Sequence, residues 1–238
     1  MAGEFIIKII AEIGQNYNGD LELAKDLIFA ASENGADIAK FQVFNAEETF
    51  GIAGNEWFDY NLKNQLNKDD IFKLFELCEE ADIEFMASAF HSRFIDWLEE
   101  VGVKRYKLAS REIHNKALIN ACLKTNKPIL ISLGYWDNDE FPKFANQHLI
   151  SYLFCVSKYP TLLSDINFSK IDFDKYDGFS DHTIGISASM IALSRGAKII
   201  EKHFTLDKKL YGPDHSGSMT PDELNLICSF RDDLKKCW

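Results

Sequence analysis

The feature that most constrains the fold is a repeated alternation of short apolar, β-branched segments with stretches of helical periodicity. Alternating strands and helices indicate parallel strand pairing with right-handed crossovers. Eight such units in 238 residues favour a closed barrel over an open sheet, because a barrel of this kind needs roughly 200 to 250 residues. We therefore predict an α/β chain that folds as one domain, residues 1–238, with the (β/α)8 TIM-barrel architecture.

The expected strands cover residues 5–13, 38–44, 85–90, 105–110, 128–134, 150–157, 177–183 and 198–205. The expected helices cover residues 21–34, 69–81, 92–101, 115–124, 186–195 and 221–236, with a weak helix over 138–144 that Pro142 interrupts. Residues 45–68 are expected to form an ordered lid or loop, and residues 163–176 an irregular connection. Asp20 and Thr220 are expected N-caps, with Glu223 at the capping-box position.

The composition argues against several classes of protein. A formal net charge of −11 disfavours nucleic-acid binding and docking on an anionic membrane, although a pocket in an acidic protein can be locally basic. The five cysteines are odd in number and include no C-x-x-C pair, so we expect reduced thiols in a cytoplasmic protein. The sequence shows neither a signal peptide nor an apolar run of transmembrane length.

Two of the expected strands, 177–183 and 198–205, end in polar residues around His182 and His203. The carboxyl ends of neighbouring parallel strands lie side by side, and barrels keep their chemistry at that edge. Two imidazoles there suit a divalent ion such as manganese, zinc or iron, with coordination positions left for water and substrate. The alternative is that each histidine is a hydrogen-bonded structural residue.

Other polar residues fall at the same ends of the strands. They are Glu12, Lys40, Gln42, Ser88, Lys107, Ser110, Glu112, Ser132, Ser157, Tyr159 and Ser180. Two lysines and several hydroxyls suit an anion with many acceptor oxygens, such as a phosphate with a carboxylate. Glu12 is a candidate base or holder of a metal-bound water. In the loop 207–219, Asp214 is a candidate contact for a polyhydroxylated ligand, whereas a structural role is favoured for His215.

These segments resemble the sialic acid (N-acetylneuraminate) synthase family, whose members condense phosphoenolpyruvate with an N-acylated hexosamine to form nonulosonic acids. The motifs that carry the resemblance span nearly the whole chain in family order: 11–14 (AEIG), 39–42 (AKFQ), 106–110 (YKLAS), 179–183 (FSDHT), 201–205 (EKHFT) and 212–214 (GPD). The family's catalytic domain is a (β/α)8 barrel, in agreement with the strand count.

The resemblance implies a role for each matching residue. His182 and His203 would hold a divalent ion, usually manganese, with magnesium or cobalt as alternatives. Glu12 matches the catalytic glutamate, and three residues match positions at the sugar: Glu112, Tyr159 and Asp214. Seven match positions that hold phosphoenolpyruvate: Lys40, Ser88, Lys107, Ser110, Ser132, Ser157 and Ser180. The implied reaction joins C3 of phosphoenolpyruvate to the open-chain sugar aldehyde, and phosphate then leaves with C–O cleavage.

The chain also departs from the family pattern. Tyr17 stands where many members have histidine, Ser157 where asparagine is usual, and Arg111 where a small or apolar residue is usual, beside Glu112. Typical members carry a C-terminal antifreeze-like domain that places an arginine over the sugar site of a dimer partner, and we expect this chain to have none. The lid would then be a separate polypeptide, or the acceptor would bind without it, or activity would be weakened.

Two functions from different classes therefore remain open. The first is a metal-dependent synthase that takes phosphoenolpyruvate and an amino sugar as substrates, as a homodimer or with a separate lid-domain partner. The second is a non-catalytic or regulatory subunit of a longer synthase that retains only phosphoenolpyruvate and metal binding.

Overall fold

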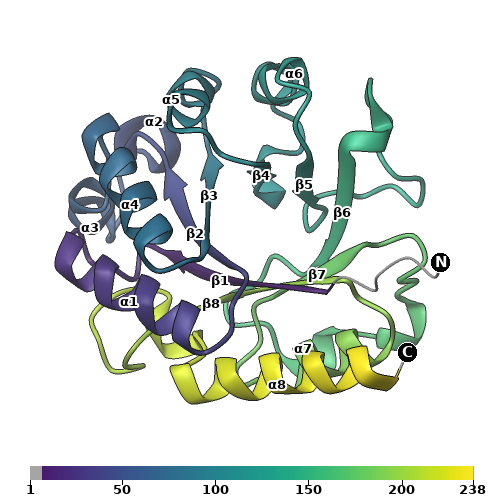
Figure 1. Ribbon diagram of the computed structural model, residues 1–238. Coiled ribbons are helices and arrows are strands. Elements are labelled where there is room, and N and C mark those ends of the chain that lie inside the picture. The colour runs from purple at the N-terminus through teal and green to yellow at the C-terminus, as the bar shows by residue number, and fades with distance from the viewer. Residues whose placement is uncertain (1–6, 238) are drawn as a thin grey trace.

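The computed structural model describes residues 7–237 and shows a closed barrel of parallel strands in chain order, as predicted (Figure 1). Strand β8 pairs with β1 and closes the barrel. The strands are β1 (Lys8–Gly14), β2 (Ile38–Val43), β3 (Glu84–Ala89), β4 (Tyr106–Leu108), β5 (Ile129–Ser132), β6 (Ile150–Cys155), β7 (Gly178–Asp181) and β8 (Ile199–His203). Phe5 and Ile6 of the first expected strand lie outside the described residues.

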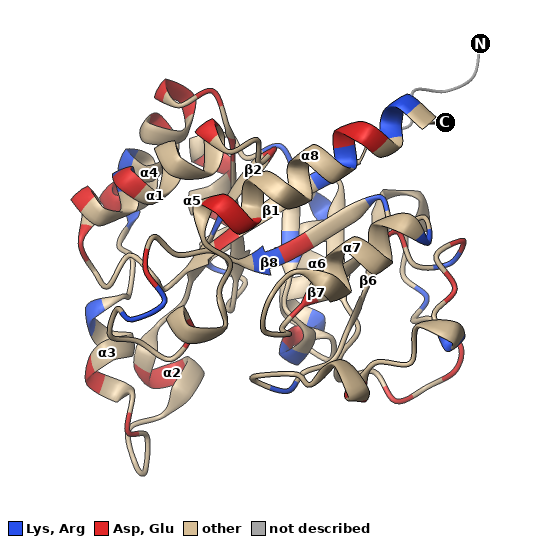
Figure 2. Cartoon of the chain, turned by 90° about the horizontal axis from the view of Figure 1, so that it is seen from below, with Lys and Arg blue, Asp and Glu red and all other residues tan. Residues whose placement is uncertain are grey.

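Helices cover much of the outside of the barrel (Figure 1). The longer helices are α1 (Leu21–Glu33), α4 (Lys68–Glu80), α5 (Phe94–Val101), α6 (Lys116–Lys124), α7 (Ser187–Ser194) and α8 (Pro221–Cys237). Asp and Glu residues lie on α1, α4, α5 and α8 and Lys or Arg residues on α1, α4, α6 and α8, whereas α7 carries neither (Figure 2). None of the helices described in residues 7–237 combines the length and the apolar character needed to cross a bilayer.

The expected helix starts follow from side chains that satisfy free backbone N–H groups. Asp20 accepts from the amide of Glu22 at 2.9 Å, which confirms it as the N-cap of α1. Helix α4 begins one residue earlier than expected, because Asn67 and Asp70 form a capping box. A capping box also begins α8. The amide of Thr220 donates to Glu223 Oε2 at 2.9 Å, and the amide of Glu223 donates to Thr220 Oγ1 at 3.5 Å.

The expected helix over 138–144 is wrong, and the β5–β6 connection contains only the short 3-10 turn η2 (Gln147–Leu149). Pro142 has no N–H to give to a helix, and its carbonyl accepts from the Tyr152 hydroxyl at 2.5 Å. Phe141 packs on the rings of Tyr152 and Tyr176, with centroids 4.9 and 4.6 Å apart. Aromatic contacts therefore pack this connection against β6, and no α-helix follows β5 there.

Four further connections carry short helical segments. The expected lid, 45–68, contains α2 (Ala46–Phe50) and α3 (Phe58–Lys63). The β6–β7 connection, expected to be irregular, contains two 3-10 turns, η3 (Leu163–Asp165) and η4 (Phe168–Lys170). Strand β4 is shorter than predicted because residues 110–112 turn into η1 (Ser110–Glu112), and η5 (His215–Gly217) lies in the loop after β8. Ser157 lies past the end of β6 rather than on it.

The interior of the barrel has an apolar layer and a polar layer. Ile10, Ile38, Met86 and Leu130 form a buried cluster inside the strands, with Ile199 packed against it. Side chains two residues further along each strand point to the same side, and these are Glu12, Lys40, Ser88, Ser132 and Glu201. The apolar cluster therefore closes one end of the barrel and leaves the polar layer at the carboxyl ends.

Helix α8 is fastened to the start of the barrel by one buried arginine. Arg231 is 7% exposed and donates through Nη1 to the Gly35 carbonyl at 2.9 Å and to Asp37 Oδ2 at 2.8 Å. The same Asp37 oxygen accepts from the amide of Ile9 in β1. This side chain thus joins the last helix to the ends of α1, β1 and β2.

We expect Arg231→Met to lower the free energy of unfolding by roughly 2 kcal/mol, because Asp37 loses its partner inside a partly buried network. Urea denaturation followed by circular dichroism measures this loss. Lys236→Met is the matched control on the same helix, since within residues 7–237 Lys236 pairs with the exposed Asp233 alone, and we expect it to change stability little. Equal effects of the two substitutions would show that Arg231 acts only as a surface charge.

Candidate active site

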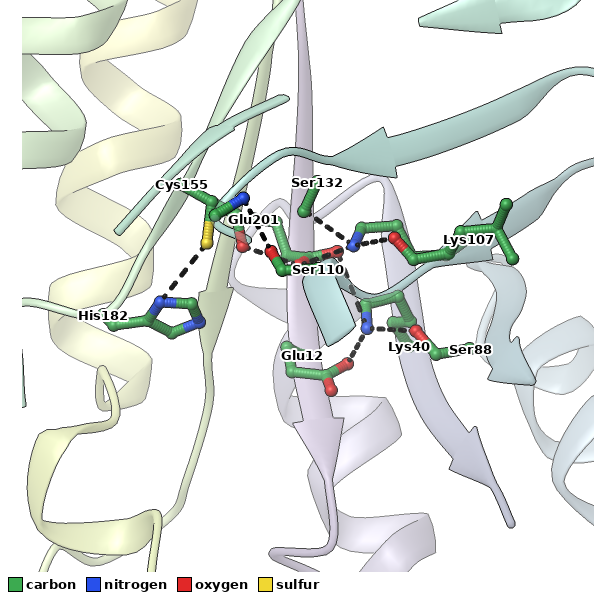
Figure 3. Close-up of polar contacts among 12 residues, drawn as sticks. Glu12, Lys40, Ser88, Lys107, Ser110, Ser132, Cys155, His182 and Glu201 are labelled. Atoms are coloured by element: carbon green, nitrogen blue, oxygen red, sulfur yellow. Dashed lines mark hydrogen bonds and ion pairs between the residues drawn. The ribbon is translucent and has the colours of Figure 1, made fainter. Parts of the chain in front are cut away.

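A small polar cavity of about 60 Å³ lies at the carboxyl ends of the strands. Most of the strand-end residues predicted from the sequence line it, namely Glu12, Lys40, Gln42, Ser88, Lys107, Ser110, Ser132, Tyr159, Ser180, His182 and His203. We call it the inner cavity. Figure 3 shows how its lysines, carboxylates and serines converge from different strands.

Two buried lysines and two buried glutamates form the centre of the inner cavity (Figure 3). Lys40 Nζ lies 2.7 Å from Glu12 and 3.6 Å from Glu201, and donates to Ser88 Oγ at 3.0 Å. Lys107 Nζ lies 3.5 Å from Glu201 and donates to Ser132 Oγ at 2.8 Å. Charges this deeply buried persist only when paired and hydrogen-bonded.

The two lysines differ in their electrostatic surroundings. Burial lowers the pKa of Lys40, but Glu12 and Glu201 outweigh burial, so that the pKa is raised overall. The pKa of Lys107 is lowered, because burial dominates over the attraction of Glu201 and Lys40 repels it. Burial would raise the pKa of Glu201, yet Lys107 and Lys40 lower it to about 2. Of the two lysines, Lys107 is thus the one whose charged form an added anion would stabilise most.

Glu12 is held by two donors at the end of β1. Its Oε1 accepts from Gln42 Nε2 at 2.8 Å, and its Oε2 pairs with Lys40. The next turn depends on Gly14, which has φ +55°. A Cβ there would lie 3.1 Å from Glu12 Oε1 and 3.4 Å from His203 Cε1. Glycine therefore leaves room for the carboxylate beside the imidazole.

The two histidine rings lie near each other, with centroids 6.0 Å apart and planes inclined by 43°. His182 Nδ1 lies 3.1 Å from the Val156 carbonyl, and Nε2 lies 3.0 Å from the Tyr159 hydroxyl. The buried Nδ1 of His203 has no hydrogen-bond partner among the described residues. An unpaired buried nitrogen calls for an explanation, and a bound ion is one. Within residues 7–237 no three His, Cys, Asp or Glu side chains gather as metal ligands, so water or substrate would complete the coordination of an ion here.

A larger chamber of about 540 Å³ opens above the inner cavity. We call it the outer chamber. Its walls include the predicted residues Gln42, Ser110, Ser157, Tyr159 and Asp214 together with the aromatic rings of Phe50, Trp57, Phe90 and Tyr135. Ser110, Tyr159 and His203 line both spaces. The two compartments thus form one continuous site.

Arg111 is the one lysine or arginine among the described residues that line the outer chamber. Its Nη2 donates to the Thr49 carbonyl at 2.8 Å, and its guanidinium lies over the rings of Phe50 and Phe90, 5.4 and 5.9 Å from their centroids. Glu112 lies behind it, 3.7 Å away, and accepts from Asn115. Glu112 lines neither compartment, so of the predicted site residues it is the one set back from the cavity.

Six residues that line the inner cavity were not predicted from the sequence: Phe90, Ala109, Cys155, Asp181, Glu201 and Lys202. Glu201 lies two positions before His203 on β8, and that spacing alone signals an inward side chain. Cys155 Sγ lies 3.7 Å from His182 Nδ1; burial raises the pKa of this thiol, but His182 and other neighbours lower it overall.

Two residues discussed from the sequence lie away from the site. His215 is fully buried, with Nδ1 2.7 Å from the Thr205 hydroxyl, which confirms its structural role. Tyr17 is also buried, and its hydroxyl donates to the Asn64 carbonyl. Neither side chain lines the inner cavity or the outer chamber.

The closed barrel, with its polar cavity at the carboxyl ends of the strands, defines the class of the protein as a (β/α)8 barrel. Residues 27–237 match the NeuB family. The chain is 39% identical to the N,N'-diacetyllegionaminic acid synthase of Legionella pneumophila, over 94% of this chain and 71% of that protein. It is 36% identical to the pseudaminic acid synthase of Helicobacter pylori, over 89% of this chain and 69% of that protein.

The solved structures agree with the sequence comparisons. The N-acetylneuraminic acid synthetase of Leptospira borgpetersenii superposes with a TM-score of 0.84 at 31% identity, over 98% of this chain and 85% of that chain. The chain therefore belongs to the NeuB family of sialic-type acid synthases, as the sequence motifs indicated.

We expect Glu201→Gln to weaken the pH dependence of the free energy of unfolding at acidic pH. The pKa of Glu201 is depressed from 4.5 to about 2 in the folded protein, so its ionised form stabilises the fold above the higher value. That contribution is lost as the pH falls from about 5 towards about 2. Urea denaturation across this window should show a smaller fall for Glu201→Gln than for the unaltered protein.

Glu100→Gln is the control for this pH experiment, because Glu100 pairs with Lys68 at the exposed surface. Its free energy of unfolding should fall with pH as steeply as that of the unaltered protein. If Glu201→Gln showed the same steep fall, the lysine pairs of Glu201 would not contribute to stability.

Proposed function

We propose that this protein condenses phosphoenolpyruvate with an N-acylated hexosamine to give a nonulosonic acid and phosphate. The observation that carries the proposal is the pairing of two compartments. A small cavity with two buried lysines opens into a larger, aromatic-walled chamber, and residues at their border line both. Two different polar substrates would thus meet where the compartments join.

The inner cavity suits the anionic substrate. Lys40 and Lys107 offer ammonium groups, and Ser88, Ser110, Ser132 and Ser180 add hydroxyl donors around them. Phosphate and carboxylate oxygens accept charge-assisted hydrogen bonds of this kind. An incoming anion would compete with Glu12 and Glu201 for the lysines and supply Lys107 with a closer counter-charge.

The outer chamber suits the acceptor sugar. Asp214 and Gln42 present acceptors and donors for hydroxyl groups, and the rings of Trp57 and Tyr135 offer apolar walls. Arg111 adds a guanidinium held in place by Thr49. The relatives named as legionaminic and pseudaminic acid synthases support an amino-sugar derivative, such as N-acetylmannosamine or a diacetylated deoxy analogue, as the acceptor.

His182 and His203 would hold a divalent ion, and the family resemblance favours manganese, with magnesium or cobalt as alternatives. A bound ion would supply Lewis-acid polarisation of the acceptor carbonyl. The unpaired Nδ1 of His203 and the proximity of the two rings support this assignment.

The reaction would proceed by orientation and charge neutralisation. Lys40, Lys107 and the serines would fix phosphoenolpyruvate with C3 towards the aldehyde carbon in the outer chamber. The π electrons of the C2=C3 bond form the C3–C1 bond while the π bond of the aldehyde C1=O breaks, and the aldehyde oxygen takes a proton from solvent to become a hydroxyl. Water adds at the electron-poor C2 and passes one proton to Glu12. The C2 hydroxyl then loses its remaining proton as the C2–O bond to phosphate breaks, which leaves a ketone at C2 and releases phosphate with that proton. Glu12 suits this role because it lies beside both Lys40 and the border of the chamber.

Phosphate release from phosphoenolpyruvate tests the proposal directly. With manganese and a panel of N-acylated hexosamines, the purified protein should release phosphate, and His182→Ala should lose at least about a hundredfold in kcat/KM because it lacks a ligand and a wall of the inner cavity. Lys104→Ala, outside both compartments, should retain activity. Phosphoenolpyruvate binding without phosphate release from any acceptor would favour the non-catalytic, regulatory role instead.

We expect Arg111→Met to raise the KM for the acceptor roughly tenfold, since a charged donor is lost from the outer chamber. The KM for phosphoenolpyruvate should stay unchanged, because Arg111 does not line the inner cavity. Steady-state kinetics with each substrate varied separately measure both values.

Arg93→Met is the matched control for Arg111→Met. Arg93 also fastens α2, through a two-point contact with Glu48, but lines neither compartment. Equal effects of the two substitutions on the acceptor KM would mean that Arg111 acts by holding α2 rather than by contacting the sugar.

A further inference from the structure

Tyr159 stands at the border of the two compartments and lines both. Its ring lies beside the ring of His182, with centroids 4.2 Å apart. The side chain is 62% exposed, and its hydroxyl has one polar contact among the described residues, to His182 Nε2 at 3.0 Å. The ring is therefore open to solvent on one side, and the hydrogen bond to His182 is what holds its hydroxyl in place.

The direction of that bond follows from the other side of the imidazole. His182 Nδ1 faces the Val156 carbonyl at 3.1 Å, and a carbonyl can only accept, so Nδ1 carries the hydrogen. Nε2 then presents a lone pair. The tyrosine hydroxyl is protonated at neutral pH and donates to it.

The same lone pair is the one that His182 would offer to an ion. A neutral imidazole has one such lone pair, so Nε2 binds either the Tyr159 hydroxyl or an ion, but not both. His203 differs, since its buried Nδ1 has no partner in the described part of the chain. An ion that enters the site thus meets one free imidazole and one that is occupied.

We propose that Tyr159 is a positioning residue that caps His182 when the ion is absent and turns its hydroxyl to the outer chamber when an ion takes Nε2. This inference rests on the metal site of the proposed function. The released hydroxyl then donates to an oxygen of the acceptor sugar, because Tyr159 already forms part of that chamber's wall. Ion binding and acceptor binding are therefore coupled, and each strengthens the other.

Calorimetric titration with Mn²⁺, supported by electron paramagnetic resonance of the free ion, tests the cap. Tyr159→Phe should bind Mn²⁺ about three- to tenfold more tightly than the unaltered protein, because no hydrogen bond has to be broken first. Tyr135→Phe, which removes a hydroxyl elsewhere in the outer chamber, should leave the Kd unchanged. His182→Ala should bind Mn²⁺ weakly.

Addition of N-acetylmannosamine should tighten Mn²⁺ binding to the unaltered protein, and this gain should be smaller in Tyr159→Phe. If Tyr159→Phe binds Mn²⁺ no more tightly while His182→Ala loses binding, the metal site stands and the cap is overturned. If neither the unaltered protein nor any variant binds Mn²⁺, both the metal site and the proposed role of Tyr159 are overturned.

Nitrogen-15 NMR of the imidazoles supplies a readout that needs no metal. In the metal-free protein, the Nε2 resonance of His182 should shift in Tyr159→Phe and stay in place in Tyr135→Phe. An unshifted Nε2 resonance in Tyr159→Phe would overturn the inference whatever the titrations show, since the hydroxyl would then not occupy that nitrogen.

Discussion

The structure depends on the burial of two lysines and two glutamates inside a closed barrel. Lys40, Lys107, Glu12 and Glu201 come from four different strands and meet at one level. Each charge is tolerable only because the others are present, since an unpaired buried charge costs several kcal/mol. The network thus ties the geometry of the site to closure of the barrel, because no pair of neighbouring strands could satisfy all four groups.

The same network bears on the anionic substrate of the proposed reaction. The lysine side chains are already oriented, so an anion would exchange partners with the carboxylates and would not need to order flexible side chains. Lys107 has one carboxylate near it where Lys40 has two, so this exchange would stabilise its positive charge more. The hydroxyls of Ser88 and Ser132 would hold the two Nζ atoms in place.

Much of this arrangement could be predicted from the sequence, because it follows local rules. Strand–helix alternation gave the barrel, and polar residues at strand ends gave the lysines, serines and histidines of the mouth. The capping residues Asp20 and Thr220 also follow from backbone chemistry that any helix start obeys. These features depend on the spacing of residues along the chain, which the sequence displays directly.

The remaining features depend on contacts between distant segments. The helix expected over 138–144 is absent because Pro142 and Phe141 are held by Tyr152 and Tyr176, which follow later in the chain. The direction of Arg111 is set by Thr49 and Phe50, some sixty residues earlier. The bond from Tyr159 to His182 requires the loop after β6 to fold back over β7. Such contacts between distant residues leave no periodic pattern in the sequence.

The two layers inside the barrel have a consequence for how the chain can change. Five strands, β1, β2, β3, β5 and β8, each supply an apolar residue that forms or packs against the buried cluster and, two positions later, a residue of the inner cavity, as with Ile38 and Lys40 or Leu130 and Ser132. A one-residue insertion or deletion within a strand would turn both to the outer face together. Insertions and deletions are therefore better tolerated in the loops that build the outer chamber, so the outer chamber can diversify while the inner cavity stays fixed.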